Sequence, residues 1–253
     1  MSPVQVSIII PCFNESSTIL EVLRRVQMVA IPGGGSKEII VVDDGSTDGA
    51  GELLASRVQE FSDVRLHRAV TNFGKGAAVR AGMALARGDV MLIQDADLEL
   101  RPEEIPELVA PILRGETEVV FGSRFLGGRG FRWSRSYFAN RVLVWLTRIL
   151  FMTRLSDMET CYKVMRRSVL DGVRLRAMGF EIEPELTAKI LRLGHRIHEV
   201  PISYEPRSEA AGKKIRAWDG LKAIYYLFKY RFQSRDKFCR PASPPEPSIQ
   251  PAK

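Results

Sequence analysis

The sequence predicts an α/β fold in which helices cover both faces of a mainly parallel sheet. Short apolar runs alternate along the chain with longer segments whose apolar residues recur at helical spacing. Parallel strands need a crossover connection, and the intervening helices supply it. The 253 residues, 45% of them hydrophobic, are enough to bury one large core.

Each element of this fold can be placed on the sequence. Ser16 or Ser17 would cap the first helix, and Gly88 would end the third. The expected strands are VSIII, EIIVV, VRLHRA, DVMLI and EVVFGSRF, at residues 6–10, 38–42, 64–69, 89–93 and 118–125. The expected helices cover residues 16–30, 46–61, 74–88, 102–113 and 217–238.

Polar residues directly follow four of these strands. The segments are PCFNES, VDDGSTDG, QDADLE and GSRF. In parallel α/β sheets ligands bind at the carboxyl ends of the strands, so these segments predict one polar crevice. The stretch DDGSTDG is equally typical of a capped turn with no other role.

Three acids, Asp95, Asp97 and Glu99, follow the strand expected at residues 89–93. Alternate residues of an extended chain share a face, so these carboxylates would lie together and repel one another. Mg²⁺ or Mn²⁺ would remove the repulsion, because both bind carboxylate oxygen and keep positions open for water or phosphate. The segment predicts a divalent cation site. The alternative is that the acids only cap the helix beginning near Pro102.

Two glycine-rich segments do not match known phosphate-binding loops. NFGKGAA contains Lys75 but lacks the spacing and the Lys-Ser/Thr ending of a P-loop. GGGSKE, at residues 33–38, precedes a strand, whereas a dinucleotide fingerprint precedes a helix. The sequence therefore disfavours a Rossmann dehydrogenase.

The net charge of +7 is concentrated in one segment. Seven arginines and no acid lie between Arg124 and Arg154, interleaved with aromatic residues. This composition predicts an anion-binding surface. A nucleic acid is the alternative ligand, but the neighbouring acids would repel a polyanion, so we expect none.

Residues 217–238 are expected to form an amphipathic helix. Its apolar stripe is Trp218, Leu221, Ile224, Tyr225 and Phe228, with Lys222, Lys229, Arg231, Arg235 and Lys237 around it. Such a helix suits an anionic membrane surface, although the stripe could equally pack on the protein's own core. The Pro-rich tail beyond it is expected to be disordered.

Several motifs together resemble family 2 glycosyltransferases of the GT-A fold. They are SIIIPCFNE, VVDDGSTDG, NFGKGAAVRAG and QDADLE, in this order. GSRF, DMETCYKVMRR, GFEIEPELTAKILRLGHRIHEVPISYEPR and GKKIRAWDG are similar to the dolichol-phosphate mannose and glucose synthase branch. The resemblance covers about residues 4–230. The chain departs from it at Phe13, where relatives often have Tyr, and in lacking the transmembrane segment that some relatives append.

The resemblance implies a nucleotide-sugar donor of the GDP-mannose or UDP-glucose type. It assigns the donor to residues at the strand ends and in two loops. The implied donor residues are Pro11, Asn14, Glu15, Asp43, Asp44, Lys75, Asp95, Lys213 and Lys214. For the last two, a solvated surface loop is the competing interpretation. Asp95 and Asp97 match the family's metal-binding DxD motif, with Glu99 as a further oxygen ligand for Mg²⁺ or Mn²⁺.

The acceptor implied by the resemblance is a polyprenyl phosphate. Arg124, Arg132 and Ser136 would hold its phosphate, because the guanidinium fork donates two parallel hydrogen bonds and keeps its charge. One displacement would invert the anomeric centre and give a β-linked product. The alternatives are a family 2 enzyme with a hydroxyl acceptor and a non-catalytic nucleotide-sugar-binding module.

These expectations divide the chain into a catalytic domain over residues 1–232 and a basic, then Pro-rich, tail over 233–253. Within the domain, residues 4–123 would form the Rossmann-like nucleotide-sugar and metal half, and 124–232 the acceptor half. Three scattered cysteines indicate a reducing compartment, and neither a signal peptide nor a transmembrane run is recognisable. We therefore expect a cytoplasmic protein, peripheral on the cytoplasmic face of a membrane.

Overall fold

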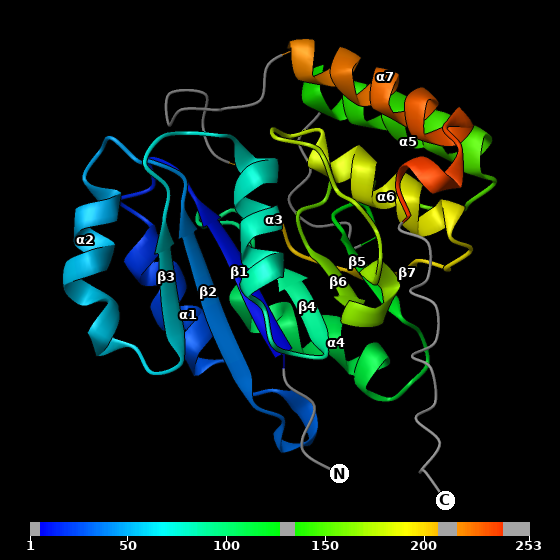
Figure 1. Cartoon of the computed structure of the whole chain (residues 1–253). Coiled ribbons are helices and arrows are strands. Elements are labelled where there is room, and N and C mark those ends of the chain that lie inside the picture. The colour runs from blue at the N-terminus through cyan, green and yellow to red at the C-terminus, as the bar shows by residue number, and fades with distance from the viewer. Residues whose placement is uncertain (1–5, 127–134, 207–216, 240–253) are drawn as a thin grey trace, which may run out of the picture.

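A single seven-stranded sheet forms the centre of the molecule (Figure 1). The structure is a computed structural model that describes residues 6–126, 135–206 and 217–239, with residues 135, 136 and 217 described by their backbone only. The strand order is β3-β2-β1-β4-β6-β5-β7. The strands are β1 Val6–Cys12, β2 Lys37–Asp43, β3 Val64–Arg68, β4 Val90–Ile93, β5 Val119–Ser123, β6 Lys163–Arg166 and β7 His198–Pro201.

The sheet is mainly parallel, as the sequence predicts. β1 pairs in parallel with β2 and β4, β2 with β3, and β5 with β7. β6 is the exception, since it runs antiparallel between β4 and β5. All seven residues of β1 are buried, which is expected for a central parallel strand covered on both faces.

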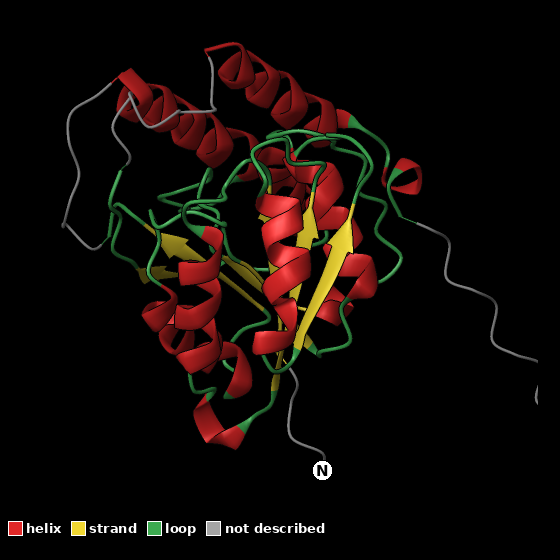
Figure 2. Ribbon diagram, turned by 90° about the vertical axis from the view of Figure 1, so that its left-hand side faces the viewer, coloured by secondary structure: helices red, strands yellow, loops and turns green. Residues whose placement is uncertain are grey.

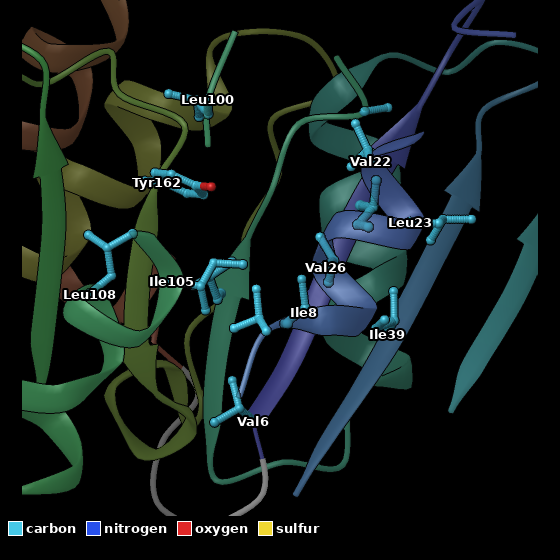
Figure 3. Close-up of a cluster of buried hydrophobic side chains, with 14 of the residues drawn as sticks. Val6, Ile8, Val22, Leu23, Val26, Ile39, Leu100, Ile105, Leu108 and Tyr162 are labelled. Carbon is cyan, nitrogen blue, oxygen red and sulfur yellow. The ribbon is translucent and has the colours of Figure 1, made fainter. Parts of the chain in front are cut away.

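Two buried clusters, one on each face of the sheet, make up the core. One lies under α1, α2 and α4, and Figure 3 shows Ile8 and Ile39 pointing from the sheet toward Val22 and Val26 of α1. The other contains side chains of α3, α5, α6 and α7.

The helices are α1 Ile19–Met28, α2 Ala50–Arg57, α3 Lys75–Leu85, α4 Ile105–Leu113, α5 Arg135–Phe151, α6 Ile182–Arg192 and α7 Ala217–Phe232. Short 3₁₀ turns are η1 Pro32–Gly34, η2 Val58–Glu60, η3 Pro102–Glu104, η4 Arg167–Leu170 and η6 Arg235–Lys237.

The first helix does not begin where the sequence predicts. The expected cap at Ser16 or Ser17 is wrong, because the Ser16 amide donates to Asp48 Oδ2 at 2.8 Å and Thr18 precedes the first helical residue. Thr18 Oγ1 donates to the carbonyl of Ala96 at 2.9 Å. This bond ties the start of α1 to the loop after β4.

The folded part also extends past the boundary expected at residue 232. The ring of Phe238 is 1% exposed, and the amide of Arg174 donates to the Phe238 carbonyl at 2.7 Å. A β-bridge joins Val173 to Cys239. Residues 233–239 therefore pack on the domain and are not part of a disordered tail, while the Pro-rich residues 240–253 lie outside the described ranges.

Gly82 allows α3 to approach β1 closely, which gives a test of the fold. A Cβ at Gly82 would lie 2.3 Å from Cγ2 of the fully buried Ile9. We expect Gly82→Ala to lower the free energy of unfolding by roughly 1–3 kcal/mol through overpacking, measured by urea denaturation. Gly220→Ala is the matched control in α7, where nothing lies within 4 Å and the better helix propensity should stabilise by up to about 1 kcal/mol. Equal loss in both variants would contradict the close packing of α3 on β1.

Candidate functional site

A cavity of about 360 Å³ opens at the carboxyl ends of the parallel strands. Segments from both halves of the chain line it, including the loops after β1, β2, β4 and β5. This confirms the predicted crevice. Its lining residues are Pro11, Cys12, Phe13, Glu15, Asp44, Asn72, Gly74, Lys75, Ala78, Asp95, Ala96, Asp97, Glu99, Arg124, Glu159, Cys161, Gly179, Phe180, Glu183 and Tyr204.

Asp44 is the acid of the loop after β2 that reaches the cavity. Its carboxylate accepts hydrogen bonds from the backbone amides of Phe73, at 3.0 Å, and Gly74, at 2.7 Å. Burial raises the pKa of Asp44 above its usual range, and the two amide hydrogen bonds limit that rise. Asp44 therefore orients the loop that leads into α3 and shapes this side of the cavity.

Two other predicted donor residues stabilise the loop and do not line the cavity. Asn14, at φ 52°, accepts the amide of Thr47 through Oδ1 at 2.8 Å. Asp43 accepts the amide of Ser46 at 3.1 Å and pairs with Arg68 at 3.5 Å. In this structure both act on the turn between β2 and α2. The other predicted donor residues at the strand ends, Pro11, Glu15, Asp44, Lys75 and Asp95, line the cavity.

The three acids after β4 do not continue the strand. β4 ends at Ile93, so the expected extended segment with one shared face is wrong. Asp97 Oδ1 instead accepts a hydrogen bond from the backbone amide of Glu99 at 3.1 Å, which closes a turn. Glu99 Oε2 accepts a hydrogen bond from the hydroxyl of Tyr204 at 3.1 Å. All three acids still line the cavity.

These acids fit a divalent cation in part. Within the described ranges, no three His, Cys, Asp or Glu side chains are arranged to hold a metal ion by themselves. Asp95 and Asp97 nevertheless present hard oxygen donors to a cavity wide enough for a diphosphate, which would supply further oxygen ligands. The ligand set Asp95, Asp97 and Glu99 stays a prediction.

Lys75, the first residue of α3, forms an ion pair with Asp95 of this acidic turn. Its Nζ lies 2.8 Å from Asp95 Oδ1, 3.2 Å from Glu183 Oε1 and 2.8 Å from Cys161 Sγ. Burial opposes its charge, but Asp95, Cys161 and Glu183 together raise the pKa of Lys75 well above its usual range. Lys75 is therefore charged at neutral pH and neutralises part of the acidic cluster.

Arg124 directly follows β5 and lines the cavity. Nε and Nη2 donate to the two oxygens of the fully buried Asp157 at 2.7 and 2.8 Å. Burial alone would raise the pKa of Asp157, but the Arg124 charge and hydrogen bonds hold it below its usual range. The guanidinium also lies 5.1 Å from the ring centroid of Tyr204. Arg124 is thus fixed in place, with Nη1 as the nitrogen not facing Asp157.

The other predicted anion-binding residues lie outside the described ranges or are described by their backbone only. Arg132, Lys213 and Lys214 lie outside the described residues. Ser136 is in the first turn of α5, where only the backbone is described. Their roles stay predictions.

The sequence reading missed the residues that precede β6. Leu92 of β4 pairs with Val164 of the antiparallel β6, so the residues before Lys163 lie where β4 ends. Glu159 and Cys161 therefore line the cavity. Burial, reinforced by the nearby charge of Glu183, raises the pKa of Glu159 to about 7. Glu159 precedes its strand, so a prediction from the residues that follow the strands does not include it.

Glu183 lies in the first turn of α6. In the structure it is 2% exposed and pairs with the buried Lys163 as well as with Lys75. It connects α6 to the cavity wall and belongs to the site.

The chain is similar in sequence to several named transferases. A dolichol-phosphate mannosyltransferase from Pyrococcus furiosus is 31% identical over 235 residues, covering 89% of this chain and 64% of that protein. An undecaprenyl-phosphate mannosyltransferase from Micrococcus luteus is 32% identical over 216 residues, covering 81% of this chain and 85% of that protein. A 4-deoxy-4-formamido-L-arabinose transferase from Pseudomonas aeruginosa matches over 114 residues only, at 41% identity and 33% of its length.

Solved structures share the fold. A glucosyl-3-phosphoglycerate synthase from Mycobacterium tuberculosis, in complex with UDP, superposes with a TM-score of 0.69 and 22% identity over 90% of this chain and 80% of that one. Another structure of that synthase contains Mn²⁺ together with UDP-glucose. The expected GT-A fold is confirmed. The model of glycosyl transferase family 2 matches residues 7–174, so the chain belongs to glycosyl transferase family 2.

Proposed function

We propose that the chain is an inverting glycosyltransferase that moves a hexose from a nucleotide sugar to a polyprenyl phosphate. The observation that carries this proposal is one continuous cavity with Asp95 and Asp97 on one wall and Arg124 on another. A nucleotide sugar bound near the acids would place its sugar next to an anion held near the arginine. Two of the similar proteins are named as mannosyltransferases acting on polyprenyl-type phosphates.

The transfer places few chemical demands on the chain. A phosphate monoester is already ionised near neutral pH, so the acceptor needs no strong general base. The chain must hold two anionic groups in line on opposite sides of the sugar. Arg124 and Arg132 would hold the acceptor phosphate, while Asp95, Asp97 and Glu99 face the donor side. A single displacement of this kind gives a β-linked product from an α-linked donor.

Mg²⁺ or Mn²⁺ held by Asp95 and Asp97 would neutralise the charge that develops on the diphosphate leaving group. Lys75 reaches the same side of the cavity and adds a fixed positive charge there. Asp44 and Pro11 line the part of the cavity next to β1 and β2, where the nucleoside would lie.

The outer surface of α5 and α7 fits a lipid membrane. The two helices lie side by side at one end of the molecule (Figures 1 and 2). Each has an exposed apolar stripe with spacings of three and four residues. The stripes are Phe138, Val142, Trp145, Ile149 and Met152 beside α5, and Trp218, Leu221, Tyr225, Phe228 and Phe232 along α7.

The two interpretations of the C-terminal helix concern different faces of it. Ala223, Leu227 and Tyr230 are buried, so one face of α7 packs on the core. The aromatic stripe faces outward, and exposed cations including Arg141, Lys222 and Lys229 accompany the two stripes. Apolar side chains flanked by cations suit an anionic lipid surface.

We propose that this pair of helices rests on the cytoplasmic face of the membrane that contains the acceptor. All three cysteines are free, which fits a reducing compartment. None of the described helices combines the length and apolar composition needed to cross a bilayer.

A second candidate is a family 2 enzyme with a hydroxyl acceptor. The specific observation in its favour is Glu159, because a hydroxyl nucleophile needs a nearby carboxylate base and Glu159 lines the cavity with a pKa of about 7. The acceptor panel below separates the two candidates.

The first prediction concerns transfer. Radiolabelled sugar from UDP-glucose or GDP-mannose should pass to undecaprenyl or dolichyl phosphate in detergent with Mg²⁺ or Mn²⁺, and EDTA should abolish it. Arg132→Ala should lower kcat/KM by roughly 10²–10³-fold, since removing one donor to a reacting anion has effects of that size. Glu116→Ala, on a surface remote from the cavity, is the control. Transfer that requires a hydroxyl acceptor and has the same rate in wild type and Arg132→Ala would favour the second candidate.

The second prediction concerns the membrane. The chain should co-sediment with vesicles of phosphatidylglycerol and phosphatidylcholine, and less so at high salt. Trp145→Glu with Trp218→Glu should reduce binding by at least about tenfold, because both rings, 63% and 65% exposed, would enter the interface. Met28→Glu, at an 85% exposed position on α1, should bind as the wild type does. Equal binding by all three proteins would contradict the assignment of this surface.

A further inference from the structure

Glu159 lies between the two halves of the proposed site. Across the sheet, the acids follow β4, the segment with Glu159 precedes β6, and Arg124 follows β5, while β6 lies between β4 and β5. The segment with Glu159 therefore lies between the segments with Asp95 and Arg124, and all three residues line one cavity.

Glu159 is half-buried, and one of its carboxyl oxygens has no hydrogen-bond partner among the described residues. This oxygen, Oε1, is enclosed. Among the described residues, the nearby cations Lys163 and Arg124 already have partners, since Lys163 pairs with Glu183 and Arg124 forms a bidentate pair with Asp157. An enclosed carboxyl oxygen without a partner costs stability, so a ligand that hydrogen-bonds to it would recover part of that cost.

We propose that Glu159 hydrogen-bonds a hydroxyl group of the transferred sugar. This inference rests on the glycosyl transfer proposed above, in which the sugar occupies the space between the donor diphosphate and the acceptor phosphate. It makes Glu159 a determinant of which sugar is accepted.

A sugar hydroxyl fits this position better than the other groups of the substrates. A phosphate would be repelled by Glu159 and by the neighbouring Glu183 and Asp157. A hydroxyl is uncharged and both donates and accepts hydrogen bonds. With a pKa of about 7, set by burial and by Glu183 and opposed by Lys163 and Arg124, the carboxyl can match either role near neutral pH.

The test compares ligands that differ only in the sugar. Calorimetry with Mn²⁺ would measure the binding of UDP-glucose against UDP, and of GDP-mannose against GDP, for wild type, Glu159→Ala, Glu159→Gln and the control Glu116→Ala. Glu159→Ala should lower the affinity for the nucleotide sugar by roughly 10- to 100-fold, as expected for the loss of a hydrogen bond to a charged group. The affinity for the nucleoside diphosphate should fall by less than about twofold. Glu159→Gln should recover part of the loss.

The outcomes separate this inference from the function on which it rests. Equal affinities of wild type and Glu159→Ala for the nucleotide sugar, with the diphosphate still bound, would overturn the sugar contact alone. A wild type that binds neither diphosphate nor nucleotide sugar would overturn both. Unchanged binding of the nucleotide sugar together with lost turnover on a hydroxyl acceptor would also overturn it, in favour of a general base.

Thermal unfolding gives an independent check on the burial of Glu159. A folded-state pKa raised from 4.5 to about 7 means that the neutral carboxyl favours folding at low pH, and this contribution is lost as pH rises through about 7. The Arg124, Lys163, Asp157 and Glu183 charges that surround it are the same in Glu159→Gln. The Gln variant should therefore unfold at a higher temperature than wild type at pH 8, with a much smaller difference at pH 5. No difference at either pH would contradict an enclosed, unpartnered carboxyl oxygen.

Discussion

A chain of ion pairs connects the elements that form the site. Lys163 of β6 pairs with Glu183 of α6, Glu183 pairs with Lys75 of α3, and Lys75 pairs with Asp95 after β4. These residues come from two separate parts of the sequence. Lys163 and Glu183 are buried, and removing one partner of a buried pair leaves an uncompensated charge in the protein interior, which typically costs about 3–5 kcal/mol. The position of the acidic turn therefore depends on the packing of α3 and α6 as much as on β4.

The parallel part of the fold and its crevice could be predicted because burial on both faces leaves a clear signature. Near-continuous apolar runs such as VSIII and EIIVV are typical of parallel strands that are buried on both faces. β6 and β7 could not be predicted in the same way. They are four residues long, KVMR and HEVP, and their charged residues interrupt any apolar pattern.

The direction of β6 explains what was missed at the site. The sequence does not indicate whether a strand pairs parallel or antiparallel with its neighbours. The segments that follow the predicted strands contain Asp95 and Arg124. Glu159 and Cys161 precede an antiparallel strand and therefore could not be predicted in this way. Arg124 itself was found, but its pairing with Asp157 was not, because 33 residues separate them. That pairing changes the interpretation of Arg124. The carboxylate offsets its charge. Under the proposed function, the attraction for an acceptor phosphate would therefore have to come from other arginines of the same segment as well, and Arg124 would contribute mainly a fixed direction.

The same reasoning applies to the acids after β4, where the repulsion anticipated from the sequence is only partly real. Lys75 already neutralises Asp95, and the turn closed by Asp97 and Glu99 moves the carboxylates off a common strand face. A divalent cation held by Asp95, as proposed above, would share that carboxylate with a half-buried lysine whose charge opposes it. A diphosphate would resolve this competition, because its negative charge attracts both cations at once. Under the proposed function, metal and nucleotide would therefore bind more tightly together than either alone, and Lys75 would favour a cation that arrives with a diphosphate.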